Sequence, residues 1–261
     1  MNNTLLKVEN LTKTFVENSG FLGLGKRNIH AVESVSFELK KGEVLGLVGE
    51  SGSGKTTLGR CVLRLIEPSS GKIEFDGKDI TNLEIPARSS IGLGRSLQIT
   101  NIFLNFTLIE NIIIAIQSKM NIAFNFWKFS FIEKDFIDIA NNILQMEGLE
   151  EKKDELSSNI SHGDKRLLDL ALSVVITPKL LLLDEPMAGV GKEDSKKIIK
   201  IIKKLKSEKK CSILLIEHDM DTVFKLADRI TVMANGNILA SGKINEIKNN
   251  KLVRKVYLGE E

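Results

Sequence analysis

The sequence has little cysteine, no long apolar run and no large excess of charge of either sign. Its two cysteines, Cys61 and Cys211, lie inside apolar segments and are not spaced as metal ligands. A disulfide framework is therefore not expected, and a reducing compartment is the default. No segment approaches the roughly 18 apolar residues that cross a bilayer, so a membrane-spanning partner would be another chain. The N-terminal residues also lack the pattern of a signal peptide.

The charges nearly balance, with 37 Lys and Arg against 34 Asp and Glu, a net charge of +3. This gives no basic surplus of the kind that nucleic-acid binders carry, so no nucleic acid is expected as a partner. Apolar residues make up 42% of the 261 residues, which is enough for a sizeable core. The length suits one large α/β domain, or one core with an inserted subdomain.

Near the N-terminus, alternation of apolar and polar residues predicts strands at 6–8, 35–39 and 72–75. Asp76-Gly77 follows the third of these and is a strong signal for a hairpin turn. The segment 18–28 contains three glycines and is predicted to be a loop.

Other strands are continuously apolar, as expected when both faces of a strand are buried. They are predicted at 44–48, 180–183, 213–216 and 230–233. A helix over 58–66, stopped by Pro68, follows the first, and helical patterns separate the others. This alternation predicts a largely parallel sheet. Residues 99–177 carry helical patterning without a clear strand, and they predict an inserted helical subdomain.

The strongest chemical signal is the segment 49–56, which has the spacing of a phosphate-binding loop: glycine, four residues, glycine, lysine and a hydroxyl residue. The glycines let successive amide groups point at phosphate, and the following helix adds its positive N-terminal end. Lys55 is expected to reach the β- and γ-phosphates of ATP, and Thr56 to ligate Mg²⁺. A chance glycine-rich turn is the alternative. The predicted nucleotide ligands are Gly49, Glu50, Ser51, Gly52, Ser53, Gly54, Lys55, Thr56 and Thr57.

Two acidic residues follow the buried strand 180–183. Asp184 is predicted to hold Mg²⁺, and Glu185 to orient or deprotonate the attacking water. The alternative is a helix cap, which a pair of acids after four leucines does not favour. His218 ends another parallel strand, at the edge where ligands collect in α/β sheets. It is predicted to sense the γ-phosphate, although a lone histidine is more often structural.

In this order, these residues resemble the ATPases of the ABC transporter family, over essentially the whole chain. The resemblance implies an α/β fold with a RecA-like P-loop NTPase core, an N-terminal antiparallel β subdomain and an inserted α-helical subdomain. Residues 1–261 would form a single ABC ATPase domain. The core and β subdomain would comprise 1–97 and 178–261, and the helical subdomain with the signature motif 98–177.

The resemblance also assigns roles that spacing alone does not. Gln98 matches a glutamine that links the core to the helical subdomain, with a catalytic and a metal-binding role. The segment Ser161-His162-Gly163 matches the signature sequence that caps the γ-phosphate of ATP held by a partner subunit. Phe15 matches the aromatic residue that stacks on adenine, with ordinary core packing as its alternative.

Three positions depart from the commonest pattern of the family. His162 stands where glycine is usual, Asp164 where glutamine is usual, and Gly191 where aspartate or asparagine is commoner. The Ser-His-Gly form is itself characteristic of the branched-chain amino acid and urea importers. Gly191 removes a polar side chain from the expected dimer seam and puts the efficiency of coupled hydrolysis in question.

The resemblance points to two kinds of transporter. Residues up to about Leu83 resemble the oligopeptide and dipeptide importers, whereas the chain from Gly94 onward resembles the branched-chain amino acid subgroup. The second part is given more weight, because in this family it contains the surface that touches the membrane partner. We therefore expect an ATP-hydrolysing subunit of an importer of branched-chain or other amino acids. The alternatives are a peptide importer, a lipopolysaccharide-type exporter, and a non-transport ABC ATPase.

The expected partners are transmembrane permease subunits and a second ATPase subunit, either a second copy or a paralogue. A solute-binding protein is expected in the complete system, and the chain is expected to lie peripherally at the cytoplasmic face of the plasma membrane. An aromatic cluster in the helical insert is predicted to form a small core, with a permease docking surface as the alternative. Its members are Phe124, Phe126, Trp127, Phe129, Phe131 and Phe136.

Overall fold

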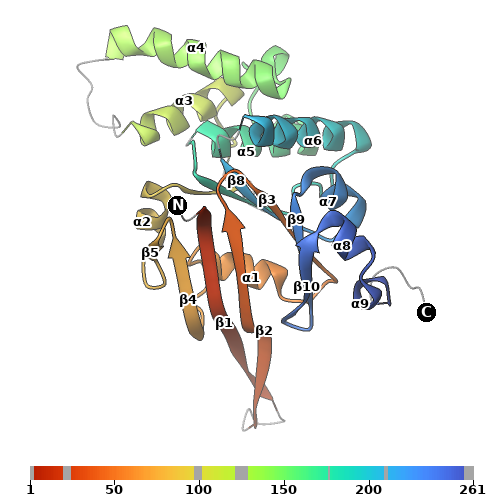
Figure 1. The fold of residues 1–261 in the computed structure, drawn as a ribbon. Coiled ribbons are helices and arrows are strands. Elements are labelled where there is room, and N and C mark those ends of the chain that lie inside the picture. Colours follow the sequence, from red (N-terminus) through yellow and green to blue (C-terminus); the bar gives the residue numbers. More distant parts are fainter. Residues whose placement is uncertain are drawn as a thin grey trace.

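The structure is a computed structural model that describes residues 3–19, 25–96, 102–120, 129–175, 177–208 and 211–255. It contains two sheets and a group of helices (Figure 1). One sheet is antiparallel, with strand order β2-β1-β4-β5. Its strands are β1 (Thr4–Ser19), β2 (Gly25–Lys40), β4 (Ser70–Phe75) and β5 (Lys78–Asp79).

The second sheet has the order β10-β9-β3-β8-β7-β6. All of its pairings are parallel except that of β10 with β9. Its strands are β3 (Val44–Gly49), β6 (Leu93–Ser96), β7 (Leu180–Asp184), β8 (Ser212–Glu217), β9 (Arg229–Ala234) and β10 (Asn237–Lys243). Because β3, β8 and β7 are neighbours and parallel, the residues that end these strands gather at one edge of the sheet.

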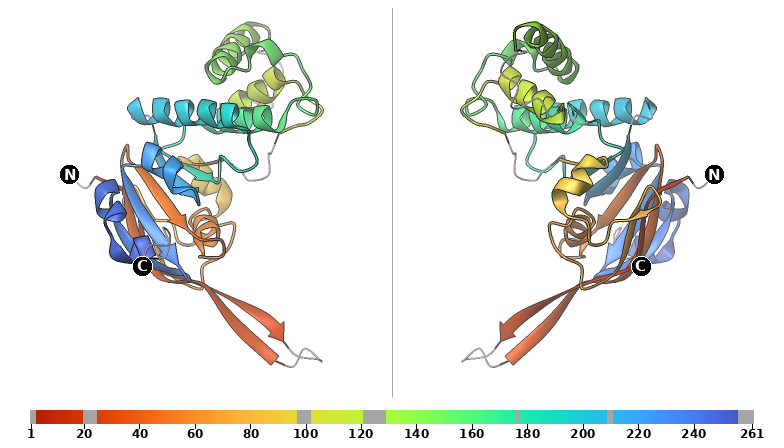
Figure 2. Two further views of the ribbon diagram at one scale, coloured as in Figure 1. Left: turned by 90° about the vertical axis from the view of Figure 1, so that its right-hand side faces the viewer. Right: turned by 90° about the vertical axis from the view of Figure 1, so that its left-hand side faces the viewer.

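The helices lie between the sheets and on the far side of the parallel sheet. They are α1 (Lys55–Val62), α2 (Ile85–Ser90), α3 (Leu108–Lys119), α4 (Phe129–Glu147), α5 (His162–Val175), α6 (Lys192–Ser207), α7 (Met220–Leu226), α8 (Ile244–Lys248), α9 (Lys251–Val253) and the 3-10 turn η2 (Glu150–Lys152). In Figures 1 and 2, α3 and α4 lie at the end of the molecule opposite the outer parts of strands β1 and β2. None of these helices is long and apolar enough to cross a membrane, among the residues described.

The parallel sheet separates two hydrophobic cores, and successive side chains along its strands pack alternately into one core and the other. Leu181 and Leu183 of β7 face the core built with α3, α4, α5 and α6. Leu180 and Leu182 face the second core, which α1 shares with the antiparallel sheet. Both sides of the strand are therefore buried, as the continuous apolar run predicted.

Helices α3 and α4 pack mainly on each other and on α5. Helix α3 begins with a capping box in which Thr107 and Glu110 satisfy each other's backbone amide groups. Phe136 of α4 is buried in the core, at 5% exposure, which agrees with the core interpretation for this member of the aromatic cluster. Residues 124–127 lie outside the described part, and the side chains of Phe129 and Phe131 are not described.

The prediction of a loop over 18–28 is wrong at both ends of that range, which belong to strands β1 and β2. β1 and β2 pair as far as Ser19 opposite Gly25, and their hairpin forms an arm that projects away from the body (Figure 2). The arm was not predicted because an exposed two-stranded ribbon has no buried face, and so no apolar alternation marks it in the sequence.

Two further boundaries differ from the prediction. The helix after the glycine-rich loop begins at Lys55 and ends at Val62, and Arg64 then has a positive φ of 62°. The edge strand β6 was missed, because only one residue in it, Leu93, was recognisably apolar and core-facing. Its pairing with β7 is visible only once the sheet is assembled.

Candidate functional site

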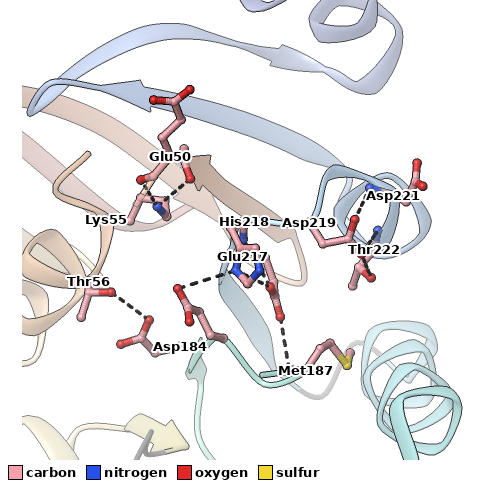
Figure 3. A network of polar contacts seen from close by, with 12 residues as sticks. Glu50, Lys55, Thr56, Asp184, Met187, Glu217, His218, Asp219, Asp221 and Thr222 are labelled. Carbon is pink, nitrogen blue, oxygen red and sulfur yellow. Dashed lines mark hydrogen bonds and ion pairs between the residues drawn. The ribbon is translucent and has the colours of Figure 1, made fainter. Parts of the chain in front are cut away.

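The glycine-rich loop runs from the end of β3 into the first turn of α1 (Figure 3). Two of its glycines have a positive φ, 80° at Gly52 and 99° at Gly54. A Cβ on Gly54 would lie 2.1 Å from the backbone oxygen of Ala31, so no side chain fits there without moving the loop. The amide groups at this start of α1 are placed to bind an anion.

Lys55 folds back into this loop. Its Nζ donates hydrogen bonds to the backbone oxygens of Gly49 and Glu50, each at 2.7 Å, and to Ser53 Oγ at 3.3 Å. Burial lowers the pKa of Lys55, and the carboxylates of Glu185 and Asp184 oppose that shift. The ammonium group is therefore held in the loop by oxygens that phosphate oxygens can replace.

Asp184 lies at the end of β7 and is buried, at 4% exposure. Its Oδ1 accepts a hydrogen bond from Thr56 Oγ1 at 3.3 Å, across the sheet edge (Figure 3). A carboxylate and a hydroxyl are the hard oxygen ligands that Mg²⁺ uses together with nucleotide phosphates. This donor set fits a magnesium ion without a larger protein cage.

Glu185 and His218 directly follow two neighbouring strands, β7 and β8. His218 Nδ1 lies 3.8 Å from Glu185 Oε1 and 3.8 Å from Glu217 Oε2. The side chain of His218 is 62% exposed and that of Glu185 is 26% exposed, so both can meet a ligand. Glu185 has a positive φ of 48°, and its amide donates to Ile216 O at 2.9 Å. Such a conformation is costly away from glycine and fixes where the carboxylate points.

The sequence interpretation missed Glu217 as a member of this site. It is buried, at 1% exposure, and it accepts hydrogen bonds from the amide groups of Met187 at 3.2 Å and His218 at 3.3 Å. Burial raises its pKa. Glu217 thereby ties the loop after Glu185 to the end of β8. The signal available was an acid that ends a buried strand, the same signal that marked Asp184.

The predicted signature segment lies at the start of α5. Ser161 Oγ donates to Asp164 Oδ2 at 2.7 Å and accepts from the Asp164 amide at 3.1 Å. A Cβ on Gly163 would lie 1.9 Å from Asp194 Oδ2, so α5 approaches the first turn of α6 closely. His162 Nε2 lies 3.5 Å from where a Cβ on Gly189 would be. Among the described residues, no hydrogen bond or ion pair joins this segment to the loop 49–57 of the same chain.

The other predicted site residues are more scattered. Phe15 lies on the β1–β2 arm, is 39% exposed, and has the Lys13 ammonium 5.0 Å from its ring centroid. Gln98 lies outside the described residues. Gly191 occupies the N-cap of α6 and supplies no side-chain cap.

A buried strand, a glycine-rich loop with a lysine, a helix, and an acid ending a nearby parallel strand together define a P-loop nucleotide-binding protein. The ABC transporter family model matches residues 32–188. LivG, a high-affinity branched-chain amino acid transport ATP-binding protein of Salmonella typhimurium, is 35% identical over 88% of this chain and 92% of its own. BraF, a protein of the same description from Pseudomonas aeruginosa, is 31% identical over the full length of both chains.

The chain belongs to the ABC transporter family, and it is an ATP-binding cassette ATPase of that family. A nucleotide-free ATP-binding cassette from an ABC transporter matches it with a TM-score of 0.79 and 29% identity, over 98% of this chain and 100% of the other. The ADP conformation of another such cassette matches with a TM-score of 0.79 and 26% identity, over 99% and 100%. The family and the fold class predicted from the sequence are both confirmed.

Proposed function

We propose that the chain powers an importer of branched-chain or other amino acids. The support is its similarity to LivG and BraF over most or all of their lengths. MetN, a methionine import ATP-binding protein of Mannheimia succiniciproducens, is 30% identical over 94% of this chain but only 67% of its own. Amino acid import is therefore favoured over the peptide importer, lipopolysaccharide exporter and non-transport alternatives.

The geometry at the edge of the parallel sheet carries the proposed ATPase chemistry. Lys55 would exchange its backbone partners for the β- and γ-phosphates of ATP. Thr56 and Asp184, already in contact, would hold Mg²⁺, with Gln98 as a further ligand. Bound there, Mg²⁺ would neutralise charge on the β- and γ-phosphates. The amide groups of residues 49–57 would surround the phosphates.

Glu185 would act on the attacking water. Its partly exposed carboxylate accepts the water's hydrogen bond and then its proton, as the water oxygen attacks the γ-phosphorus and ADP leaves. His218, 3.8 Å from Glu185, would donate to a γ-phosphate oxygen and report its presence. Glu217 holds the loop after Glu185 through the Met187 amide and so positions this pair.

A complete site would need a second ATPase subunit, facing the first head to tail. Among the described residues, the segment Ser161-His162-Gly163 makes no polar contact with the phosphate-binding loop 49–57 of the same chain. Its serine and histidine are exposed at the start of helix α5. It would cap the γ-phosphate of ATP bound by the facing subunit, a second copy or a paralogue. The exposed ring of Phe15 would stack on adenine.

Permease subunits would dock in the groove between the core and the helical insert. This groove has a volume of about 1020 Å³ and is lined by parts of α2, α3 and α5, including Ser90, Ala115 and Leu172. Phe103 borders it with 53% of its surface exposed. Its lining mixes apolar residues such as Leu172 with polar ones such as Ser90, and a groove of this kind suits a helix of a partner protein. Such docking would place the chain at the cytoplasmic face of the plasma membrane, in a system that includes a solute-binding protein.

The test is affinity purification of the chain from its native membranes, with the co-purifying proteins identified. Recovery of a branched-chain type permease pair supports the proposal. A peptide-type permease would shift the assignment to the alternative suggested by the N-terminal third. Recovery of ribosomes or DNA-bound proteins without a permease would exclude transport, and the ATPase chemistry would remain.

That chemistry is tested separately with purified protein. Glu185→Gln should abolish ATP turnover while ATP still binds, because the amide cannot take a proton from water. Turnover at the wild-type rate in Glu185→Gln would remove Glu185 from the catalytic role.

A further inference from the structure

The signature serine of this chain is bound to a carboxylate that also binds a lysine. Asp164 Oδ2 accepts a hydrogen bond from Ser161 Oγ at 2.7 Å, and it forms an ion pair with Lys152 Nζ at 2.6 Å. The side chain of Asp164 is 6% exposed and that of Lys152 is 43% exposed. Burial opposes ionisation of Asp164, but the hydrogen bonds from Lys152 and Ser161 outweigh it and hold its pKa below the ordinary value. The group is therefore a carboxylate that only accepts hydrogen bonds.

This arrangement occupies the only proton of the Ser161 hydroxyl. The hydroxyl donates that proton to the Asp164 carboxylate, and the Asp164 amide donates to the same hydroxyl oxygen, so Ser161 can only accept further hydrogen bonds. A phosphate oxygen is also an acceptor, so it cannot bond to Ser161 in this state. To bind a γ-phosphate, the hydroxyl must turn its proton from Asp164 to the phosphate, and Asp164 then loses one of its two side-chain donors.

Lys152 makes that exchange possible. It binds the same oxygen as Ser161, so the buried carboxylate keeps a charged partner when the serine turns away. Without Lys152, a buried carboxylate would keep the serine proton and would repel the incoming phosphate. The other charges nearby do not take its place. Lys197 also helps to lower the pKa of Asp164, but only through charge at a distance, and it is paired with Asp194 at 3.5 Å. Asp194 is itself a second carboxylate, against Gly163.

We propose that Lys152 and Asp164 are positioning residues for the Ser161 hydroxyl. Lys152 keeps the Asp164 carboxylate paired when the hydroxyl turns away from it, so that the hydroxyl can donate to the γ-phosphate of ATP bound by a facing subunit. This inference rests on the proposed function, because it needs the head-to-tail pair. It concerns a residue at which the signature departs from the commonest pattern, Asp164 where glutamine is usual, and a lysine nine positions before Ser161.

The test uses the Glu185→Gln chain, in which ATP should bind without being consumed, and measures the ATP concentration that gives half-maximal dimer by light scattering. Lys152→Ala should raise that concentration about tenfold, the equivalent of ~1.4 kcal/mol. Lys152→Arg should restore it, because arginine also donates to a carboxylate. Asp164→Asn in the Lys152→Ala chain should also restore it, since a neutral amide needs no cation.

Lys153→Ala is the matched control, because it removes the same charge one position away. Binding of a fluorescent ATP analogue to the monomer should be unchanged in all variants, since Lys152 is not part of the loop 49–57. If alanine lowers the melting temperature, Lys152→Met keeps the aliphatic stem and takes its place. A merely structural ion pair would change the melting temperature and leave the ATP concentration unchanged.

The outcomes separate the two proposals. If the Glu185→Gln chain never dimerises with ATP, the head-to-tail pair itself fails. If it dimerises, and the ATP concentrations for half-maximal dimer of Lys152→Ala and Lys153→Ala agree within twofold, the role of Lys152 is overturned. If the Lys152→Ala, Asp164→Asn double variant needs as much ATP for half-maximal dimer as Lys152→Ala alone, the unpaired charge of Asp164 is not what weakens dimerisation in Lys152→Ala.

Discussion

Thr56 and Asp184 are separated by 128 positions in the sequence, yet the Thr56 hydroxyl lies 3.3 Å from the Asp184 carboxylate. The contact exists because β3 and β7 both pair with β8 in parallel, so the segments that follow β3 and end β7 meet at one edge of the sheet. If this pair holds Mg²⁺, changing either residue should mainly reduce the gain in ATP affinity that Mg²⁺ produces. The affinity for ATP without the metal should change less.

We expect Asp184→Asn to reduce the gain in ATP affinity that Mg²⁺ produces by tenfold or more, about 1.4 kcal/mol. Thr56→Val should act in the same direction, and Thr56→Ser, which keeps the hydroxyl, should not. Calorimetric titration with ATP, with Mg²⁺ and with a chelator, measures this difference. An equal loss of affinity under both conditions would mean that the pair shapes the loop and does not hold the metal.

Much of this site could be predicted from the sequence because its signals are local. The glycine and lysine spacing of 49–56 and the two acids after 180–183 each combine a turn, a buried strand and a charge within a few residues. Glu217 ends a buried strand as Asp184 does, but that local signal does not give its role, which depends on Met187, 30 positions away, and on burial in the assembled sheet.

The same distinction explains the fold. Strands buried on both faces, such as β7, were predicted almost to the residue, because a continuous apolar run is hard to mistake. The β1–β2 arm and the edge strand β6 are stabilised by backbone pairing with a neighbour, with few buried side chains. Backbone pairing is available to any sequence, so composition and periodicity do not reveal it.

The glycine at position 54 should be required by the fold itself, before any nucleotide binds. Gly54→Ala combines a φ of 99° with a Cβ 2.1 Å from the Ala31 backbone oxygen, which cannot swing aside as a side chain would. Gly52→Ala has a φ of 80° but meets nothing within 4 Å. Gly52→Ala should therefore cost about 1–2 kcal/mol, and Gly54→Ala should cost a further 1–3 kcal/mol or so for the overlap.

Urea denaturation of the nucleotide-free proteins checks this pair, since it removes ligand binding from the comparison. Equal losses of stability in the two variants would show that the positive φ dominates and that the loop can move away from Ala31 at little cost.

Glu147, at the end of α4, should make stability depend on pH. It is 5% exposed, its Oε2 has no hydrogen-bond partner among the described residues, and burial raises its pKa to about 8, against the opposing charge of Lys204. The folded protein therefore keeps a proton that the unfolded chain releases above pH ~4.5. The free energy of unfolding should fall as the pH rises from about 4.5 to about 8, and level off above that.

Glu147→Gln removes this dependence, because the amide resembles the protonated acid and does not titrate. The variant should match the parent near pH 4.5 and exceed it at pH 8 by at most a few kcal/mol, at ~1.4 kcal/mol for each pKa unit. Denaturation across this range, with the exposed Glu150→Gln as control, measures the difference. A constant difference between variant and parent at all pH values would show that Glu147 ionises normally in the folded state.

Gly191 leaves helix α6 without a side-chain cap. Its backbone, with φ −70° and ψ 165°, is already that of an N-cap residue, and an added Cβ would meet nothing within 4 Å. Gly191→Asn should therefore stabilise the protein in two ways. The side-chain oxygen can accept from the amide groups of the first turn, and the unfolded chain loses the freedom of a glycine. Asparagine is preferable to aspartate, because Glu193 and Asp194 already place negative charge in that turn.

The expected gain is about 0.5–1 kcal/mol, or a rise of roughly 1–4 °C in melting temperature. Gly191→Ala separates the two contributions, because it restricts the unfolded chain without adding a cap. If alanine and asparagine stabilise equally, the amide groups of the first turn are already satisfied. If asparagine alone stabilises, the glycine costs this chain a helix cap, and any benefit of Gly191 must then lie in the assembled transporter, where turnover with its permease can be compared between the two forms.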